Sequence, residues 1–152
     1  TLNLSDSVRD NRSLAAIGVA AHECGHAIQD NQEYFPLVLR RAMVPITNIS
    51  SMLSMPLILI GVLMSMNQTL INFGIILFSF AVVFQLITLP VEFNASRRAL
   101  NILESRQILT AEELPAAKKV LRAAALTYVA ALLSSLLQLL RLVLLFGGRS
   151  RD

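Results

Sequence analysis

The sequence predicts a mostly α-helical, multi-pass membrane protein, and two features of the 152-residue chain support this prediction. First, hydrophobic residues make up 55% of the chain and charged residues 15%, whereas soluble domains average about 45–50% apolar and about 25% charged residues. Second, three long apolar stretches alternate with segments rich in arginine and lysine. The net charge of +3 therefore does not indicate nucleic-acid binding, because the basic residues flank apolar segments as in cytoplasmic loops of membrane proteins.

Residues 1–42 are expected to form a short strand and a helix. Residues 1–5 alternate polar and apolar side chains, which indicates a short edge strand, and the polar stretch 5–13 indicates a loop. Ser13 can cap a helix that continues through an alanine-rich stretch and ends near residues 29–31. We expect this segment to lie at the cytoplasmic face of the membrane.

Residues 43–91 are predicted to form a transmembrane helical hairpin, since this stretch contains no charged residue. A polar break at residues 67–69 divides it into spans over 43–66 and 70–91. Each span is long enough, because a bilayer core about 30 Å thick requires about 20 helical residues. Pro90 is expected to end or kink the second span.

The rest of the chain is expected to return to the first side of the membrane and then cross it again. Residues 92–122 are predicted to contain a helix that begins at Glu92 and a basic connecting helix, in which Pro115 suits the first turn. Residues 123–152 are predicted to form the third transmembrane helix and a tail, since the apolar part of this stretch holds a single charge.

The basic residues predict the orientation of these spans. Those at the far end of the three spans are Arg149 and Arg151, whereas those of the connecting segments collect on the side of Glu92. By the positive-inside rule, that side faces the cytoplasm. The functional site is therefore expected to face the cytoplasm.

The sequence His22-Glu23-x-x-His26 has the spacing of a zinc metallopeptidase helix. Positions i and i+4 share one face of a helix, so both imidazoles can reach one metal ion, and the chain has no other histidine. Zinc lowers the pKa of a bound water to about 7, and Glu23 can act on that water as general base. The alternative is a chance motif, although an apolar helix has no structural need for these three polar residues on one turn.

A catalytic zinc usually has three protein ligands, so a further ligand is required. The acidic residues on the same side are Asp6, Asp10, Asp30, Glu33, Glu92, Glu104, Glu112 and Glu113. Glu92 is favoured, because a carboxylate directly after an apolar span is costly unless it is paired or bound to metal. The alternative is an interfacial glutamate that pairs with Arg97 or Arg98. Ser96 could hydrogen-bond a ligand imidazole or its own backbone, and Arg97 or Arg98 could stabilise an oxyanion or anchor the chain at the membrane surface.

These residues resemble the YugP family of bacterial membrane zinc metallopeptidases, which implies that the chain lies in the cytoplasmic (inner) membrane of a bacterium. The matching segments are residues 15–29, 89–100 and 123–131. The resemblance implies that Glu92 is the third zinc ligand, in a zincin-type, gluzincin-like pair of helices, and that the N-terminal strand lines the substrate cleft. The pattern Glu92-x-x-Ala95-Ser96 is also similar to the Glu-x-x-Ala-Asp helix of HtpX-like and CAAX-prenyl proteases, with Ser96 in place of the Asp that steadies a ligand histidine.

The sequence therefore predicts a membrane-embedded zinc metalloendopeptidase that hydrolyses peptide bonds by attack of a zinc-bound water. His22, His26 and Glu92 would bind Zn²⁺, and Glu23 would be the general base. The expected partners are a peptide or membrane-protein substrate and the lipid bilayer, without nucleic acid. The alternatives are a non-catalytic zinc-binding membrane scaffold and an interaction protein without metal. A closed structural zinc site has no need of Glu23, which favours the enzyme.

Overall fold

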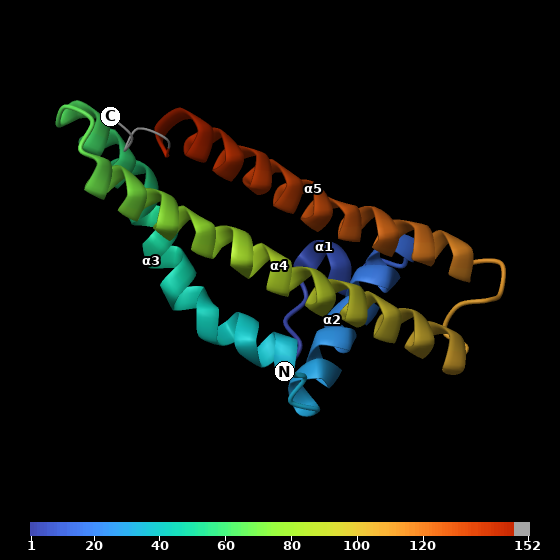
Figure 1. Ribbon diagram of the computed structural model, residues 1–152. Coiled ribbons are helices and arrows are strands. Elements are labelled where there is room, and N and C mark those ends of the chain that lie inside the picture. Colours follow the sequence, from blue (N-terminus) through green and yellow to red (C-terminus); the bar gives the residue numbers. More distant parts are fainter. Residues whose placement is uncertain (148–152) are drawn as a thin grey trace. The chain divides into compact units, whose positions relative to one another are not determined.

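The computed structural model describes residues 1–147, which form five helices and no strand (Figure 1). The helices are α1 (Asp6–Arg9), α2 (Leu14–Asn31), α3 (Phe35–Leu63), α4 (Gln68–Ser105) and α5 (Leu114–Phe146). Three of them, α3, α4 and α5, are long and apolar enough to cross a membrane. The predicted helical class and its three candidate membrane spans are thus confirmed. Residues 148–152, the end of the predicted tail, lie outside the described residues.

The N-terminal segment differs from the prediction up to Ser13. An edge strand was expected over residues 1–5, but these residues have no regular secondary structure. A strand requires a hydrogen-bonded partner strand, and residues 1–147 contain none. The segment predicted as a loop contains the short helix α1. The predicted start of the next helix is confirmed, because the Ser13 hydroxyl accepts a hydrogen bond of 3.2 Å from the backbone N–H of Ala16 and caps α2.

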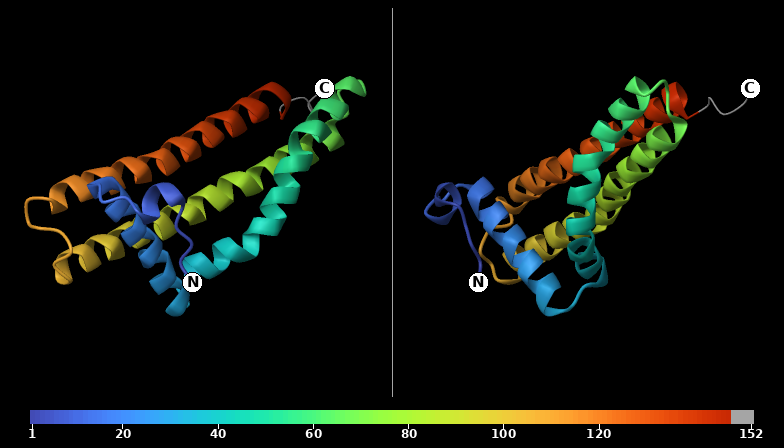
Figure 2. Two further views of the ribbon diagram at one scale, coloured as in Figure 1. Left: turned by 180° about the vertical axis from the view of Figure 1, so that it is seen from behind. Right: turned by 90° about the vertical axis from the view of Figure 1, so that its left-hand side faces the viewer.

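Helices that the sequence predicts as separate are continuous in the structure. α3 begins at Phe35 rather than at residue 43, and Pro36 lies in its first turn, where a missing N–H costs no hydrogen bond. α4 runs without interruption through Pro90, so the second predicted span and the helix of Glu92 are one helix (Figure 2). Prolines are tolerated inside membrane helices when neighbouring groups compensate for the lost bond, and Val91 and Glu92, which follow Pro90, are buried.

α5 likewise joins the predicted basic connecting helix to the third predicted span. Pro115 lies in its first turn, as expected. Ahead of it, Thr110 and Glu113 form a capping box: the Glu113 carboxylate accepts hydrogen bonds from the backbone N–H and hydroxyl of Thr110, and the Thr110 hydroxyl accepts one from the N–H of Glu113. This reciprocal cap defines where α5 begins.

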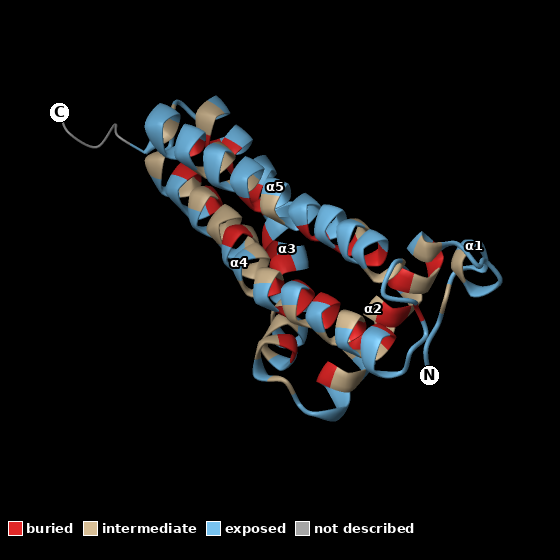
Figure 3. Cartoon of the chain, turned by 90° about the vertical axis from the view of Figure 1, so that its right-hand side faces the viewer, coloured by how far each residue is buried: buried red, intermediate tan, exposed pale blue. Residues whose placement is uncertain are grey.

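The chain divides into two compact units, of which the first comprises Thr1–Val38 and Thr88–Val129. It contains α1, α2, the C-terminal part of α4 and the N-terminal part of α5. Its core consists of small and aliphatic side chains from these helices and the α4–α5 connection, namely Ala21, Ala99, Leu103, Leu109, Ala117 and Leu121. Figure 3 shows the buried residues of α2 and α4 in red. Every candidate site residue belongs to this unit.

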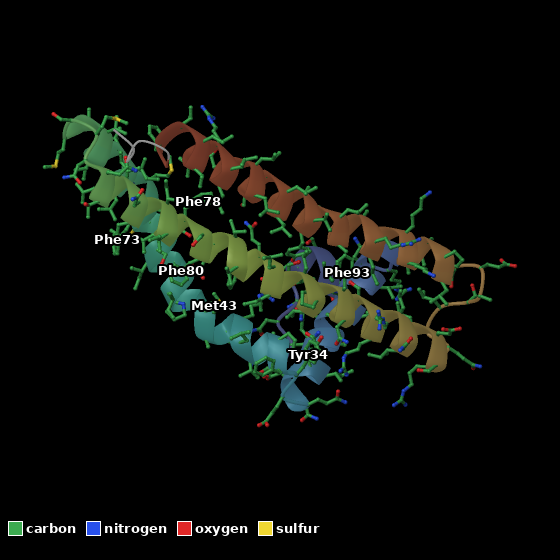
Figure 4. All side chains as sticks on the ribbon, viewed as in Figure 1. Tyr34, Met43, Phe73, Phe78, Phe80 and Phe93 are labelled. Carbon is green, nitrogen blue, oxygen red and sulfur yellow. The ribbon has the colours of Figure 1, made fainter. Side chains whose placement is uncertain are left out.

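The second unit comprises Leu39–Ile87 and the chain from Ala130 onward. Within it, α3 and α4 approach closely at a glycine, because a Cβ placed on Gly61 would lie 2.8 Å from Cγ1 of Ile71. Much of its surface is apolar, and its exposed side chains include Leu63, Leu137 and Leu144. Phe73 and Phe80, which Figure 4 labels on α4, are exposed as well. Such a surface is expected of helices whose neighbours are lipid chains.

Candidate metal centre

His22 and His26 of α2 and Glu92 of α4 lie close together in the first unit. Nε2 of His22 is 3.0 Å from Oε2 of Glu92, and Nε2 of His26 is 3.5 Å from the same oxygen. The two imidazole rings are nearly perpendicular, at 86°, with centroids 4.7 Å apart. Among residues 1–147, these three side chains form the one group of His, Cys, Asp or Glu that could hold a metal ion. The structure thus brings together the three predicted zinc ligands and none of the other acidic candidates.

Small residues allow α2 and α4 to approach each other at this point. Gly25 is buried, and a Cβ added there would lie only 2.4 Å from the carbonyl oxygen of Ala95. Ala95 and Ala99 on α4 are completely buried. A larger residue at position 25 would hold the two helices apart, so Gly25 sets the distance between the histidines and Glu92.

Gln29 orients His26, and sequence reasoning did not assign it a role. Its side chain is completely buried, and Oε1 lies 2.9 Å from Nδ1 of His26. Its amide nitrogen donates to the carbonyl oxygen of Val91 at 2.8 Å and to Oδ1 of Asn94 at 3.0 Å. A carbonyl oxygen only accepts hydrogen bonds, so the amide orientation is determined, and Oε1 must accept from His26. Nδ1 of His26 therefore carries a hydrogen, and Nε2 is the atom available to a metal.

A signal for Gln29 exists in the sequence. Gln29 follows His26 by three positions and His22 by seven, so all three side chains lie on one face of α2. A polar residue on the face that also carries the metal ligands is a candidate for a supporting hydrogen bond. This signal is weak, because Gln29 lies near the polar end of its helix, where a glutamine is usually exposed to solvent.

Ser96 lies against His22. Its hydroxyl oxygen is 3.1 Å from Nδ1 of His22, one helical turn after Glu92 on α4. With the Nδ1 atoms of His22 and His26 both engaged by polar side chains, both Nε2 atoms face the Glu92 carboxylate. This is the arrangement in which histidine ligands are usually held.

The chemistry of these donors fits a zinc ion. The side chain of Glu92 is 3% exposed, and a buried carboxylate is costly unless a cation neutralises it. A neutral His26 presents the lone pair of Nε2 to this carboxylate, and two acceptors repel unless a cation or a proton lies between them. Tetrahedral zinc binds nitrogen and oxygen at about 2.0–2.2 Å, which places ligand atoms roughly 3.3–3.6 Å apart. The observed separations of 3.0 and 3.5 Å are close to this range.

Glu23 is adjacent to the ligands and is not engaged elsewhere. It is half-buried and forms no hydrogen bond or ion pair with the rest of residues 1–147. Its charge nevertheless acts on His26. Glu92 raises the pKa of the His26 imidazole most strongly, burial opposes the rise, and the hydrogen bond to Gln29 and the charge of Glu23 add to it. An uncommitted carboxylate this close to the ligands is suited to proton transfer.

The guanidinium of Arg98 is occupied by structural contacts. It donates to Oδ1 of Asn94 at 2.7 Å and to Oε1 of Gln32 at 2.6 Å, and it lies 5.9 Å from the ring centroid of Tyr34. Asn94 in turn accepts from Gln29. Arg98 therefore helps to hold the residues that orient His26, and the oxyanion role considered from sequence stays a prediction.

Arg97 is exposed and has no ion pair among residues 1–147. Neither Arg97 nor Arg98 forms an ion pair with Glu92 among residues 1–147, which argues against the alternative of an interfacial glutamate paired with one of these arginines. Arg97 and Ser96 instead line a common cavity.

Fold and site together define a membrane-associated protein with a candidate zinc-hydrolase centre. Residues 1–147 match the family described as "Putative neutral zinc metallopeptidase", and the chain belongs to this family. It is 51% identical over 152 residues to "Putative membrane protease YugP" of Bacillus subtilis (strain 168), a match that covers 99% of the chain and 67% of that relative. No solved structure matches the chain. The predicted membership of the YugP-like family is confirmed.

Proposed function

We propose that the protein is a zinc metalloendopeptidase of the cytoplasmic membrane, with His22, His26 and Glu92 as zinc ligands and Glu23 as general base. One observation carries this proposal: two Nε2 atoms converge on a buried carboxylate while both Nδ1 atoms are engaged by other side chains. The family and the name of the relative support the same function.

The chain's own residues account for the proton transfers of peptide hydrolysis. When bound, zinc supplies a Lewis acid that polarises the scissile carbonyl and lowers the pKa of a water to about 7. His22, His26 and Glu92 would hold the ion and would leave a coordination position open, as catalytic sites require. Glu23 takes a proton from the attacking water and delivers it to the leaving amine. Ser96 and Gln29 hold the imidazole rings so that Nε2 of each faces the ion.

Metal content and cleavage, measured on matched variants, test this proposal. Purified protein should contain stoichiometric zinc and cleave peptides. Glu23→Gln should keep the zinc and lose cleavage, whereas Glu92→Ala should also lower zinc affinity. Protein without stoichiometric zinc would contradict the metal site. Equal cleavage by the wild type and Glu23→Gln would contradict the role of Glu23, and wild-type protein that binds zinc but cleaves nothing would favour the scaffold alternative.

We further propose that the site faces the cytoplasm, since the basic residues of the connecting segments lie on its side of the predicted spans. Asn67 lies in the turn between α3 and α4 and should face outward. In a Cys24→Ala background, Asn67→Cys should react with a membrane-impermeant maleimide in intact spheroplasts. Reaction only after the membrane is permeabilised would contradict this orientation.

A further inference from the structure

A small apolar cavity of about 120 Å³ adjoins the candidate metal centre. His22, Glu92 and Ser96 contribute its polar wall, and the remaining wall includes Val19 of α2 with Leu121 and Tyr128 of α5. For comparison, an apolar cavity of about 150 Å³ holds one benzene molecule. The cavity beside the ligands therefore has room for one apolar side chain.

A larger cavity of about 580 Å³ lies beside the small one, because Ser96, Leu121 and Ala125 line both. Its volume is within the range of about 300–1,000 Å³ that is typical of ligand sites. Phe93, which Figure 4 labels on α4, and Leu100 contribute apolar surface to it. A ligand that extends through both cavities would pass directly by the metal ligands.

The larger cavity carries an excess of positive charge. Its charged residues are Arg97, Lys118, Arg122 and a single acidic residue, Glu104. All three cations are exposed and form no ion pair among residues 1–147. A neighbouring cavity that shares Arg122 adds Lys119. The larger cavity thus complements a ligand that carries negative charge.

We infer that the two cavities are the substrate groove, and that it takes a peptide with an apolar side chain beside the scissile bond and an acidic side chain further along. This inference rests on the proposed peptidase function and adds a substrate class to it. The apolar side chain fills the cavity at His22, which brings the adjoining peptide bond to the ligands. The acidic side chain lies against Arg97, Lys118 and Arg122. A peptide is favoured over an anionic lipid because the cationic cavity shares Ser96, Leu121 and Ala125 with the cavity at the metal ligands.

Charge-swapped peptides and protein variants test the cationic part of the groove. The zinc-loaded full chain in phosphatidylcholine nanodiscs is assayed with quenched peptides in which Asp, Asn or Lys is moved stepwise along the sequence. At one or two positions, a peptide with Asp should have a kcat/KM on the order of tenfold higher than the peptide with Lys, mainly because its KM is lower. Added salt should reduce this difference. The double variant Arg97→Glu/Arg122→Glu should reverse the preference. Arg106→Glu, an exposed position outside both cavities, is the matched control and should retain it.

The apolar part of the groove has its own test. Val19 is an exposed residue in the wall of the small cavity, so Val19→Phe should narrow this cavity. The variant should then prefer peptides with Ala beside the scissile bond over peptides with Leu there. An unchanged ratio of kcat/KM for the Leu and Ala peptides would show that this cavity does not hold the substrate side chain.

The outcomes separate this inference from the proposed function. Glu23-dependent cleavage with equal kcat/KM for Asp and Lys peptides at every position, or with the same preference in the double variant, would overturn the inference and leave the peptidase function intact. Failure of the wild type to cleave any peptide would overturn both. Loss of binding to phosphatidylglycerol vesicles in the double variant, with unchanged peptide preference, would identify lipid as the occupant and overturn the inference.

Discussion

The close approach of α2 to α4 at Gly25 makes the substitution Gly25→Ala a sharp test of how the site is built. The added Cβ would lie 2.4 Å from the carbonyl oxygen of Ala95 and 3.0 Å from its carbonyl carbon. Favourable contacts between heavy atoms occur at about 3.5–4.0 Å, so the helices would have to separate by roughly 1 Å. The obstructing atoms belong to a helix backbone and cannot rotate away as a side chain could.

A separation of this size matters because metal sites tolerate little displacement. Ligand distances vary by about ±0.2 Å in well-formed sites, and a shift of roughly 1 Å would carry His22 and His26 away from Glu92. We expect zinc affinity to fall at least about 10–100-fold, the loss typical when a contact that orients a ligand is removed. Overpacking also costs about 1–3 kcal/mol of stability, which the better helix propensity of alanine offsets by about 0.5–1 kcal/mol.

Gly18 provides a matched control on the same helix. A Cβ added at Gly18 meets no heavy atom within 4 Å, so Gly18→Ala should keep wild-type zinc affinity and stabilise α2 slightly. Zinc affinity is measured by competition with a chromophoric chelator, and stability by thermal unfolding of the metal-free protein. Wild-type zinc affinity in Gly25→Ala would refute the reasoning that this contact sets the ligand geometry. Equal losses in both variants would show that the effect belongs to α2 in general.

Three further predictions concern the groups that hold the histidines. Gln29→Leu leaves the Nδ1 hydrogen of His26 without its acceptor, so zinc affinity should fall about 10–100-fold, and the buried unpaired groups should cost about 1–3 kcal/mol of stability in thermal unfolding. Ser96→Ala removes one neutral hydrogen bond, worth about 0.5–1.5 kcal/mol, and should weaken zinc binding less than Gln29→Leu does; a larger loss would contradict this ranking. Zinc and a proton compete for His26. Because the pKa of His26 is raised above its ordinary value of 6.5, the proton competes already at a higher pH. As the pH falls, zinc affinity should therefore begin to decline above pH 6.5. In Gln29→Leu this decline should begin at lower pH, because one cause of the raised pKa is gone, and identical pH profiles would contradict that role of Gln29.

The candidate metal ligands were largely predictable from the sequence. Helical periodicity puts His22 and His26 on one face. The cost of a carboxylate beside an apolar span favours Glu92, and the resemblance to the YugP family implied it. Helix ends were less predictable. A proline inside a helix normally signals a break, yet α4 continues through Pro90. Here the rest of the structure outweighs the local preference, which single-sequence reasoning does not capture.

Gln29 escaped prediction for a different reason. Its role depends on the carbonyl oxygen of Val91 and the side chain of Asn94, which are distant in sequence and meet Gln29 only when α2 packs on α4. The expected strand at residues 1–5 failed for the converse reason, since alternation of side chains indicates a strand only where another strand is available to pair with it.

The metal centre and the packing of α2 on α4 are one interaction. Within residues 91–96, α4 supplies the carbonyl oxygen that fixes the amide of Gln29, the carboxylate that faces both imidazoles, the backbone against which Gly25 packs, and the hydroxyl beside His22. All four groups lie within two turns of one helix, so a single contact with α2 engages them together. The ligands cannot assemble before α2 docks, and α2 cannot dock fully unless position 25 lacks a side chain. Zinc binding and helix docking should therefore be lost together in any variant that separates these two helices.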